Sequence, residues 1–169
     1  MELTALCEVV RGICVEMLEK HGFVPPVAIV VHGNRAQSDF PPVVTWEDRE
    51  RLWTVLRKIA REDKPDAIVY GDTAMCIDIA RNKFKGLTEE QQMRFCSMGA
   101  QFLAEYGYGR PQESLVVSAQ SEHSYVSVLV PFRRTDAGIV WEEPAWRNAP
   151  QSSIGLENAT KFFSGEVTQ

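Results

Sequence analysis

Polar side chains with catalytic potential follow two predicted strands. His32 comes directly after the apolar run at residues 27–31, and Asp72 comes two residues after the run at residues 67–70. If these strands are parallel neighbours joined through a helix, their C-terminal ends share the edge of the sheet where ligands of α/β proteins bind. His32 and Asp72 could then act as a base and its orienting group, or hold a metal ion. The simpler alternative is a hairpin turn at His32 and a loop cap at Asp72.

The four cysteines fit packing better than metal binding. Cys7 and Cys14 lie seven residues apart in a predicted helix, which is about 10.5 Å of rise. Two thiolates bound to one zinc ion, each about 2.3 Å from the metal, lie less than about 5 Å apart. Cys76 and Cys96 stand in apolar surroundings without a nearby histidine. We therefore expect core thiols, no metal site and no cofactor.

Large aromatic side chains are concentrated near the C-terminal end of the sequence. Trp141 and Trp146 flank an acidic segment, and Phe162 and Phe163 stand in a mostly polar tail. Tryptophan is enriched at protein interfaces because it contributes a large contact area with one polar group. These four residues therefore predict a surface for a protein partner or for a second copy of the chain. The alternative is that the tail packs on the chain's own core.

The densest basic stretch contains one aromatic residue, and its members are Arg81, Lys83, Phe84 and Lys85. Such a stretch could bind phosphates and stack a nucleobase on the ring. The formal net charge of −5 and the pI near 5.3 disfavour nucleic-acid binding, since that binding depends on basic side chains that neutralise phosphates. An exposed loop is the preferred interpretation.

Local sequence patterns predict three helices. Apolar residues recur at three- and four-residue steps over residues 2–20, Ile13 among them, and Gly22 is placed to end that helix. Thr45 and Asp48 form a capping box for a helix at residues 46–62, and Thr88 and Gln91 form another for a helix at about 89–106.

Strands are predicted at residues 27–31, 67–70, 115–119, 125–130 and 139–141, with a short additional strand at Val43 and Val44 that could pair back on the first. The last three are separated by tight turns and form a meander. The fold class is therefore α+β, a mixed but mainly antiparallel sheet with a C-terminal three-stranded meander, packed by two or three helices. We expect a single domain over residues 1–147 and a tail over 148–169 that could contain a short docking helix.

Part of the sequence resembles a loose class of small uncharacterised bacterial and phage proteins. The similarity lies in the run Asp66–Tyr70, a long connection, and then Arg110–Ser114 leading into Leu115–Ala119. In that class a strand of this kind is followed by a segment rich in proline, arginine and glutamate and then by a hairpin. The resemblance covers about residues 66–133 and implies no activity.

Two hypotheses about function follow. The sequence lacks the glycine-rich phosphate loop, the Gly-x-Ser-x-Gly elbow and the His-Glu-x-x-His zinc helix, which favours a non-catalytic binding or assembly module, a homodimer being one form of it. The alternative is a small hydrolase or metal-dependent enzyme that uses His32 and Asp72.

No apolar run approaches the roughly 20 residues of a membrane-spanning helix, and the first residues lack the basic and apolar pattern of a signal peptide. We therefore expect a cytoplasmic protein without membrane contact.

Overall fold

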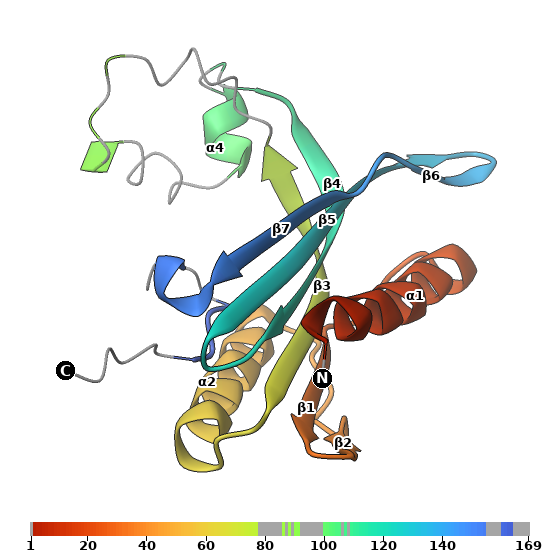
Figure 1. Cartoon of the computed structure of the whole chain (residues 1–169). Coiled ribbons are helices and arrows are strands. Elements are labelled where there is room, and N and C mark those ends of the chain that lie inside the picture. Colours follow the sequence, from red (N-terminus) through yellow and green to blue (C-terminus); the bar gives the residue numbers. More distant parts are fainter. Residues whose placement is uncertain are drawn as a thin grey trace.

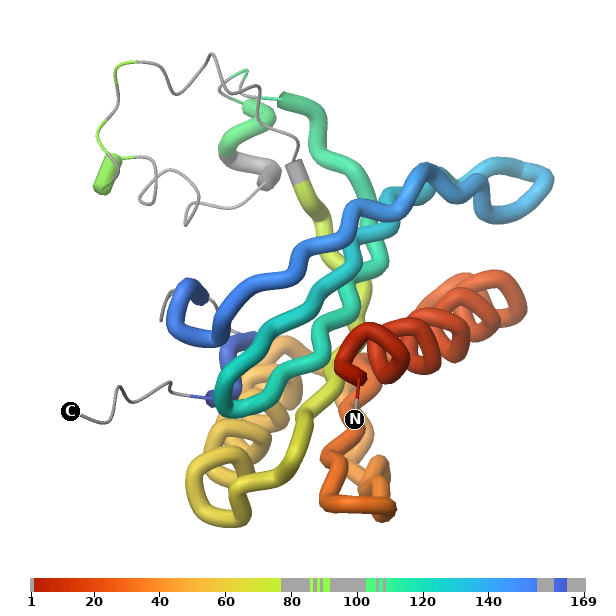
Figure 2. The backbone as a smooth tube through the Cα atoms, viewed as in Figure 1, coloured from red at the N-terminus to blue at the C-terminus, as the bar shows by residue number. Residues whose placement is uncertain are grey.

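The computed structural model describes residues 2–77, 86, 88, 90–91, 100–105, 107, 109–154 and 160–163. Its centre is a curled seven-stranded sheet in which every described pairing is antiparallel (Figures 1 and 2). The strands are β1 Val27–His32, β2 Arg35–Gln37, β3 Ala67–Ile77, β4 Pro111–Gln120, β5 Ser124–Thr135, β6 Gly138–Trp141 and β7 Ala145–Pro150. Their order is β2-β1-β3-β4-β5, and β6 and β7 both pair with β5. The predicted α+β class and the C-terminal meander are confirmed.

The helices begin and end where local signals predict. Helix α1 covers Leu3–His21, and Gly22 ends it in the left-handed conformation with its N–H bonded to the Leu18 carbonyl. Helix α2 covers Trp46–Glu62 and starts at the Thr45–Asp48 capping box. Thr88 and Gln91 also exchange the two predicted capping bonds. Of the helix expected at 89–106, the structure describes α4, Ala100–Glu105.

The two faces of the sheet carry different cores. Helix α1 packs across β3, β4 and β5 on one face, while α2 and residues 160–163 cover the other (Figure 1). Side chains alternate along β3 accordingly: Val69 belongs to the α1 core, whereas Ile68 and Tyr70 belong to the α2 core. None of the helices within the described residues is long and apolar enough to cross a membrane.

Strands β1 and β3 are antiparallel, so the parallel pair expected from the sequence is wrong. Val27 pairs with Gly71, and Val31 pairs with Ala67. The chain therefore enters β3 at the same end at which it leaves β1, and Asp66 holds this junction: its N–H donates to the Val31 carbonyl, and its carboxylate accepts the Gly33 N–H. The physical reason is β2, which runs back along β1 before α2 begins. Helix α2 then returns the chain to the end at which β1 finishes, and β3 starts there.

The strand predicted at Val43 and Val44 is also absent, because β2 at Arg35–Gln37 is the segment that pairs back on β1. It follows a two-residue turn in which Gly33 takes a positive φ of 57°, as a tight hairpin requires. At the other end of the chain, β7 runs across the predicted domain boundary at residue 147, and the 3₁₀ helix η2, Gln151–Ser153, follows it. Half of the segment suggested for a docking helix, residues 155–159 and 164–169, lies outside the described residues.

Candidate functional site

The antiparallel pairing separates His32 from Asp72. Asp72 lies one residue beyond the Val27–Gly71 pair, and His32 lies five residues from Val27 in the other direction along β1. The two are therefore six residues apart, roughly 20 Å at the rise of an extended strand. His32 is exposed at the β1–β2 hairpin turn, and Asp72 is buried within β3. No single ion or bridging water can join two groups at this separation. The hypothesis of a catalytic pair formed by His32 and Asp72 is therefore wrong.

Asp72 is instead the centre of a buried ion pair. Arg49 of α2 places Nε 2.7 Å from Oδ2 and donates from its second terminal nitrogen to Oδ1 at 3.2 Å. The Tyr70 hydroxyl donates to Oδ2 at 2.9 Å, and the Thr73 N–H donates to Oδ1 at 2.8 Å. Burial raises the pKa of Asp72, and the Arg49 charge opposes that rise. Each carboxylate oxygen thus has two partners already, which suits a structural role better than substrate binding.

Aromatic rings extend from this ion pair across the α2 core. Trp46, Trp53, Tyr70 and Phe162 form a row of edge-on contacts with successive centroid distances of 5.5, 6.3 and 5.8 Å. The Arg49 guanidinium lies 5.6 Å from the Trp46 ring centroid. Burial raises the pKa of the Tyr70 hydroxyl, so it remains a neutral hydrogen-bond donor. The row connects α2, β3 and the segment at 160–163 into one core.

The four aromatic residues predicted as a partner surface do not form one. Phe162 and Phe163 are buried in the α2 core. Trp141 is half-buried on the opposite face, where its Nε1 donates to Glu19 at 2.9 Å and its ring packs on Phe132. Trp146 on β7 stays exposed, at 41%. The exposed C-terminal aromatic surface is therefore corrected to a single tryptophan, because the chain's own core takes up the other three rings.

Metal and nucleic-acid hypotheses find no support in the described parts. There, no group of three His, Cys, Asp or Glu side chains could hold a metal ion. Cys7 and Cys14 are fully buried, and burial raises the pKa of each thiol to about 12, so both stay protonated at neutral pH. Cys96 and the predicted basic stretch, Arg81, Lys83, Phe84 and Lys85, lie outside the described residues.

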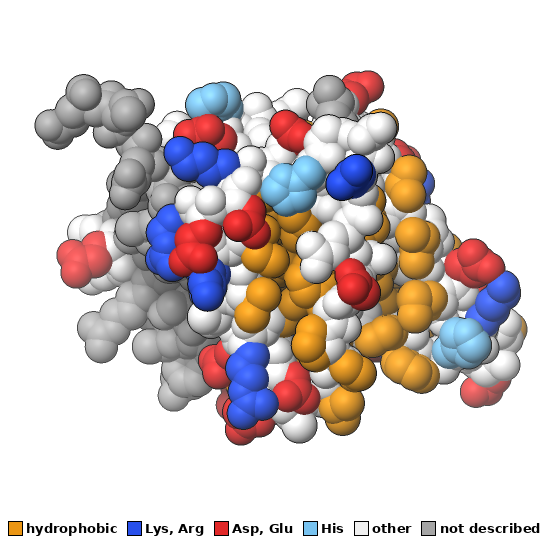
Figure 3. All heavy atoms as spheres, turned by 90° about the horizontal axis from the view of Figure 1, so that it is seen from below, with side chains coloured by type: hydrophobic (Ala, Val, Ile, Leu, Met, Phe, Trp, Pro, Cys, Tyr) orange, Lys and Arg blue, Asp and Glu red, His pale blue; other side chains and the backbone are white. Residues whose placement is uncertain are grey.

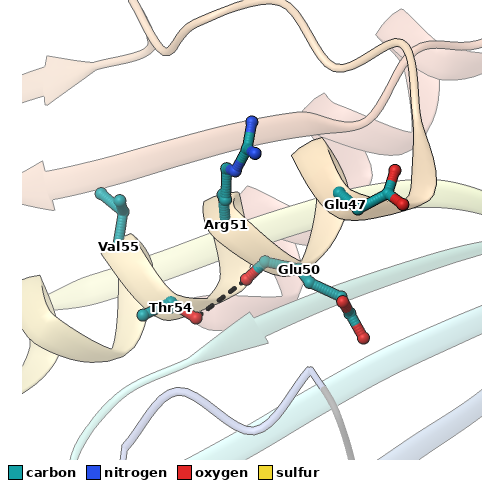
Figure 4. Close-up of a pocket in the computed structure, with 5 residues that line it drawn as sticks. All are labelled: Glu47, Glu50, Arg51, Thr54 and Val55. Atoms are coloured by element: carbon teal, nitrogen blue, oxygen red, sulfur yellow. Dashed lines mark hydrogen bonds between the residues drawn. The ribbon is translucent and has the colours of Figure 1, made fainter.

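A shallow hollow on the outer side of α2 does not form a site (Figure 4). Its described lining residues, Glu47, Glu50, Arg51, Thr54 and Val55, come from that one helix. The Thr54 hydroxyl donates to the Glu50 backbone carbonyl at 2.9 Å, which is an ordinary intrahelical bond. Ligand sites need polar groups that converge from several elements. The polar groups described in this hollow come from α2 alone.

A more informative surface lies where α1 and β1 meet. Val9, Ile13 and Phe23 are exposed at 60%, 41% and 62%, and the half-buried residues Leu6, Met17 and Ile29 pack against the buried α1 core. We call this group the α1–β1 apolar surface; its members are Leu6, Val9, Ile13, Met17, Phe23 and Ile29. Figure 3 shows hydrophobic side chains forming a broad band across the face that carries α1 and β1. The Glu16–Lys20 ion pair on α1 begins one turn after Ile13.

The position of α1 explains why this surface is uncovered. The helix packs over β3, β4 and β5 with Cys7, Val10, Cys14 and Leu18, and among the described residues only the half-buried Val27 and Ile29 of β1 reach this core. Sequence periodicity placed Ile13 in the buried stripe, but the structure leaves it exposed. Val9 was missed altogether. The available signal was the width of the apolar arc, which is larger than one helix–sheet contact can bury.

Comparisons with protein-family models, with curated proteins and with solved structures found no match to this chain. The α+β architecture and the geometry of its surfaces are therefore the observations from which a function can be inferred.

Proposed function

We propose that this chain is a non-catalytic binding and assembly module that contacts another protein chain through the α1–β1 apolar surface. The observation that carries the proposal is the exposure of three large apolar side chains, Val9 and Ile13 one turn apart on α1 and Phe23 just after its end, with the half-buried Leu6 and Met17 on the same helix. Single exposed apolar residues are ordinary, whereas a contiguous group with a charged border is typical of a protein interface.

The polar residues support a binding role more than an enzymatic one. The most buried carboxylate, Asp72, is fully engaged by Arg49, Tyr70 and Thr73. His32 stands exposed on a hairpin turn at the far end of β1. Within the described residues, therefore, no acid, base and nucleophile converge on an accessible cleft, which is what general acid–base or nucleophilic catalysis requires.

An unbiased selection of binding proteins tests the proposal. A library of small helical binders would be selected against the wild-type chain, and each binder would then be measured against the double variant Val9→Asp with Ile13→Asp. We expect most binders to lose at least about tenfold in affinity, because two apolar contacts of the interface become charged.

The matched control is Val55→Asp, which places the same charge on an exposed valine of α2. Binders should keep their affinity for this variant. Circular dichroism melts would verify that all variants fold. If most selected binders bind the double variant as well as the wild type, the α1–β1 apolar surface is not the preferred binding surface and the proposal is wrong.

A further inference from the structure

We infer that the chain which covers the α1–β1 apolar surface is a second copy of this protein, with the two α1 helices packed antiparallel across a twofold axis. This inference rests on the proposed function and names its partner. A twofold interface is self-complementary, so the same residues must suit both sides of it.

The exposed side of α1 satisfies that condition. At 100° per residue, Glu2, Val9, Ile13, Glu16 and Lys20 fall within an arc of about 60°, and all five are exposed. If the axis passes at the level of residue 11, residue n of one helix faces residue 22 − n of the other. Val9 then faces Ile13 of the second copy, and Glu2 faces Lys20 of the second copy. Val9 and Ile13 make the centre of the contact apolar, and Glu2 meets Lys20 at each end. Glu16 pairs with Lys20 within its own helix and faces residue 6 of the second copy.

Charge decides the relative direction of the two helices. A parallel arrangement would bring Glu2 against Glu2 and Lys20 against Lys20, which is unfavourable. The antiparallel arrangement replaces both repulsions by attractions, and it also sets the positive N-terminal end of each helix dipole near the negative C-terminal end of the other.

Gly12 allows the two helices to approach closely. It lies beside Val9 and Glu16 on the exposed side, and a Cβ built at this position has no heavy atom within 4 Å. A glycine inside a helix costs stability relative to alanine, and among the described residues neither a turn nor a contact requires one here. Close helix–helix packing supplies a reason for it.

A charge exchange between the two ends tests the inference. Glu2→Lys and Lys20→Glu would be made separately, and the mass in solution would be measured by sedimentation over a concentration series at low salt. Each variant alone turns two attractive pairs into two repulsive ones, so we expect its dimer to be about tenfold weaker or more.

An equimolar mixture of the two variants should restore the attraction. In the mixed dimer the lysine introduced into one variant faces the glutamate introduced into the other, and the native Lys20 of the first faces the native Glu2 of the second. Opposite charges therefore meet at both ends, and the mixture should dimerise at least as tightly as the wild type.

Two results would overturn the inference: a wild-type chain that stays monomeric at millimolar concentration, or a mixture that associates no better than the separate variants. In either case the binder selection described above decides whether the proposed function still holds without the dimer. Binders that still require Val9 and Ile13 would leave the proposed function standing with a different partner, whereas binders that ignore these residues would remove both. Thermal melts of each variant would show that the substitutions leave the fold intact.

Discussion

Replacing Arg49 by Met will lower the free energy of unfolding at pH 7 by about 2–3 kcal/mol. The substitution leaves the Asp72 carboxylate buried, with 11% of its side chain exposed and no cation beside it, and an uncompensated buried charge is strongly destabilising. The magnitude is set below that of a fully buried pair because Arg49 keeps 25% of its side-chain surface in water. Urea denaturation followed by circular dichroism would measure it.

This loss of stability should depend on pH in a definite direction. Burial raises the pKa of Asp72, and removing Arg49 raises it further. A carboxyl whose pKa is higher in the folded than in the unfolded state stabilises the fold at low pH and loses that contribution as the pH rises. The difference between wild type and Arg49→Met should therefore shrink as the pH falls through the raised folded-state pKa values of Asp72, because the carboxyl then becomes protonated in both folded proteins.

Two companion variants separate the ion pair from other effects of the substitution. Adding Asp72→Asn to Arg49→Met removes the unpaired charge and should recover part of the lost stability. Arg51→Met removes an arginine from the exposed side of the same helix and should change stability by less than about 1 kcal/mol. A loss with Arg49→Met that is the same at every pH, or that the double variant does not reduce, would contradict the assigned role of this ion pair.

Replacing Gly71 by Ala should destabilise the fold by about 1–3 kcal/mol. Helix α1 lies so close to β3 that a Cβ on Gly71 would stand 3.0 Å from Cys14 Sγ and 3.0 Å from Val10 Cγ1. Both neighbours are fully buried in the α1 core, so their side chains or the helix must shift by a few tenths of an ångström against the surrounding packing. Thermal or urea unfolding of the variant would measure the effect.

Helix α1, which packs against Gly71, provides the control. Gly12→Ala adds a methyl group where no atom lies within 4 Å, and the higher helix propensity of alanine should stabilise the monomer by about 0.5–1 kcal/mol. Combining Gly71→Ala with Cys14→Ala removes one of the two close contacts and should restore part of the lost packing. If Gly71→Ala is as stable as the wild type, α1 does not pack on β3 as closely as described.

Helices and the C-terminal meander could be predicted because their determinants are local. The Thr45–Asp48 capping box, Gly22 at the end of α1 and the turns between β4, β5 and β6 all act within a few residues. The relative direction of β1 and β3 could not be predicted in this way. It depends on whether the chain has already turned back before α2, and the three exposed residues of β2 give little hydrophobic signal.

The functional residues were harder to predict than the fold. Asp72 appeared to follow a strand because β3 was expected to end at Tyr70, whereas it continues to Ile77 and places Asp72 inside the sheet. The aromatic tail appeared exposed because its sequence is polar overall, yet Gln120 holds it against the sheet by accepting the Phe162 N–H and donating to the Thr160 carbonyl. Such contacts join segments about 40 residues apart, beyond the reach of sequence patterns.

The most direct test of the α1–β1 apolar surface is a comparison of side-chain labelling in dilute and in concentrated solution. Carbene labelling reports solvent access at Val9 and Ile13 of α1 and, as an internal reference, at Val55 of α2, all of which are exposed in the single chain. We predict that labelling of Val9 and Ile13 falls as the protein concentration rises, while labelling of Val55 stays constant. If labelling of Val9 and Ile13 stays constant over the concentration series, as it should for Val55, assembly through this surface is contradicted.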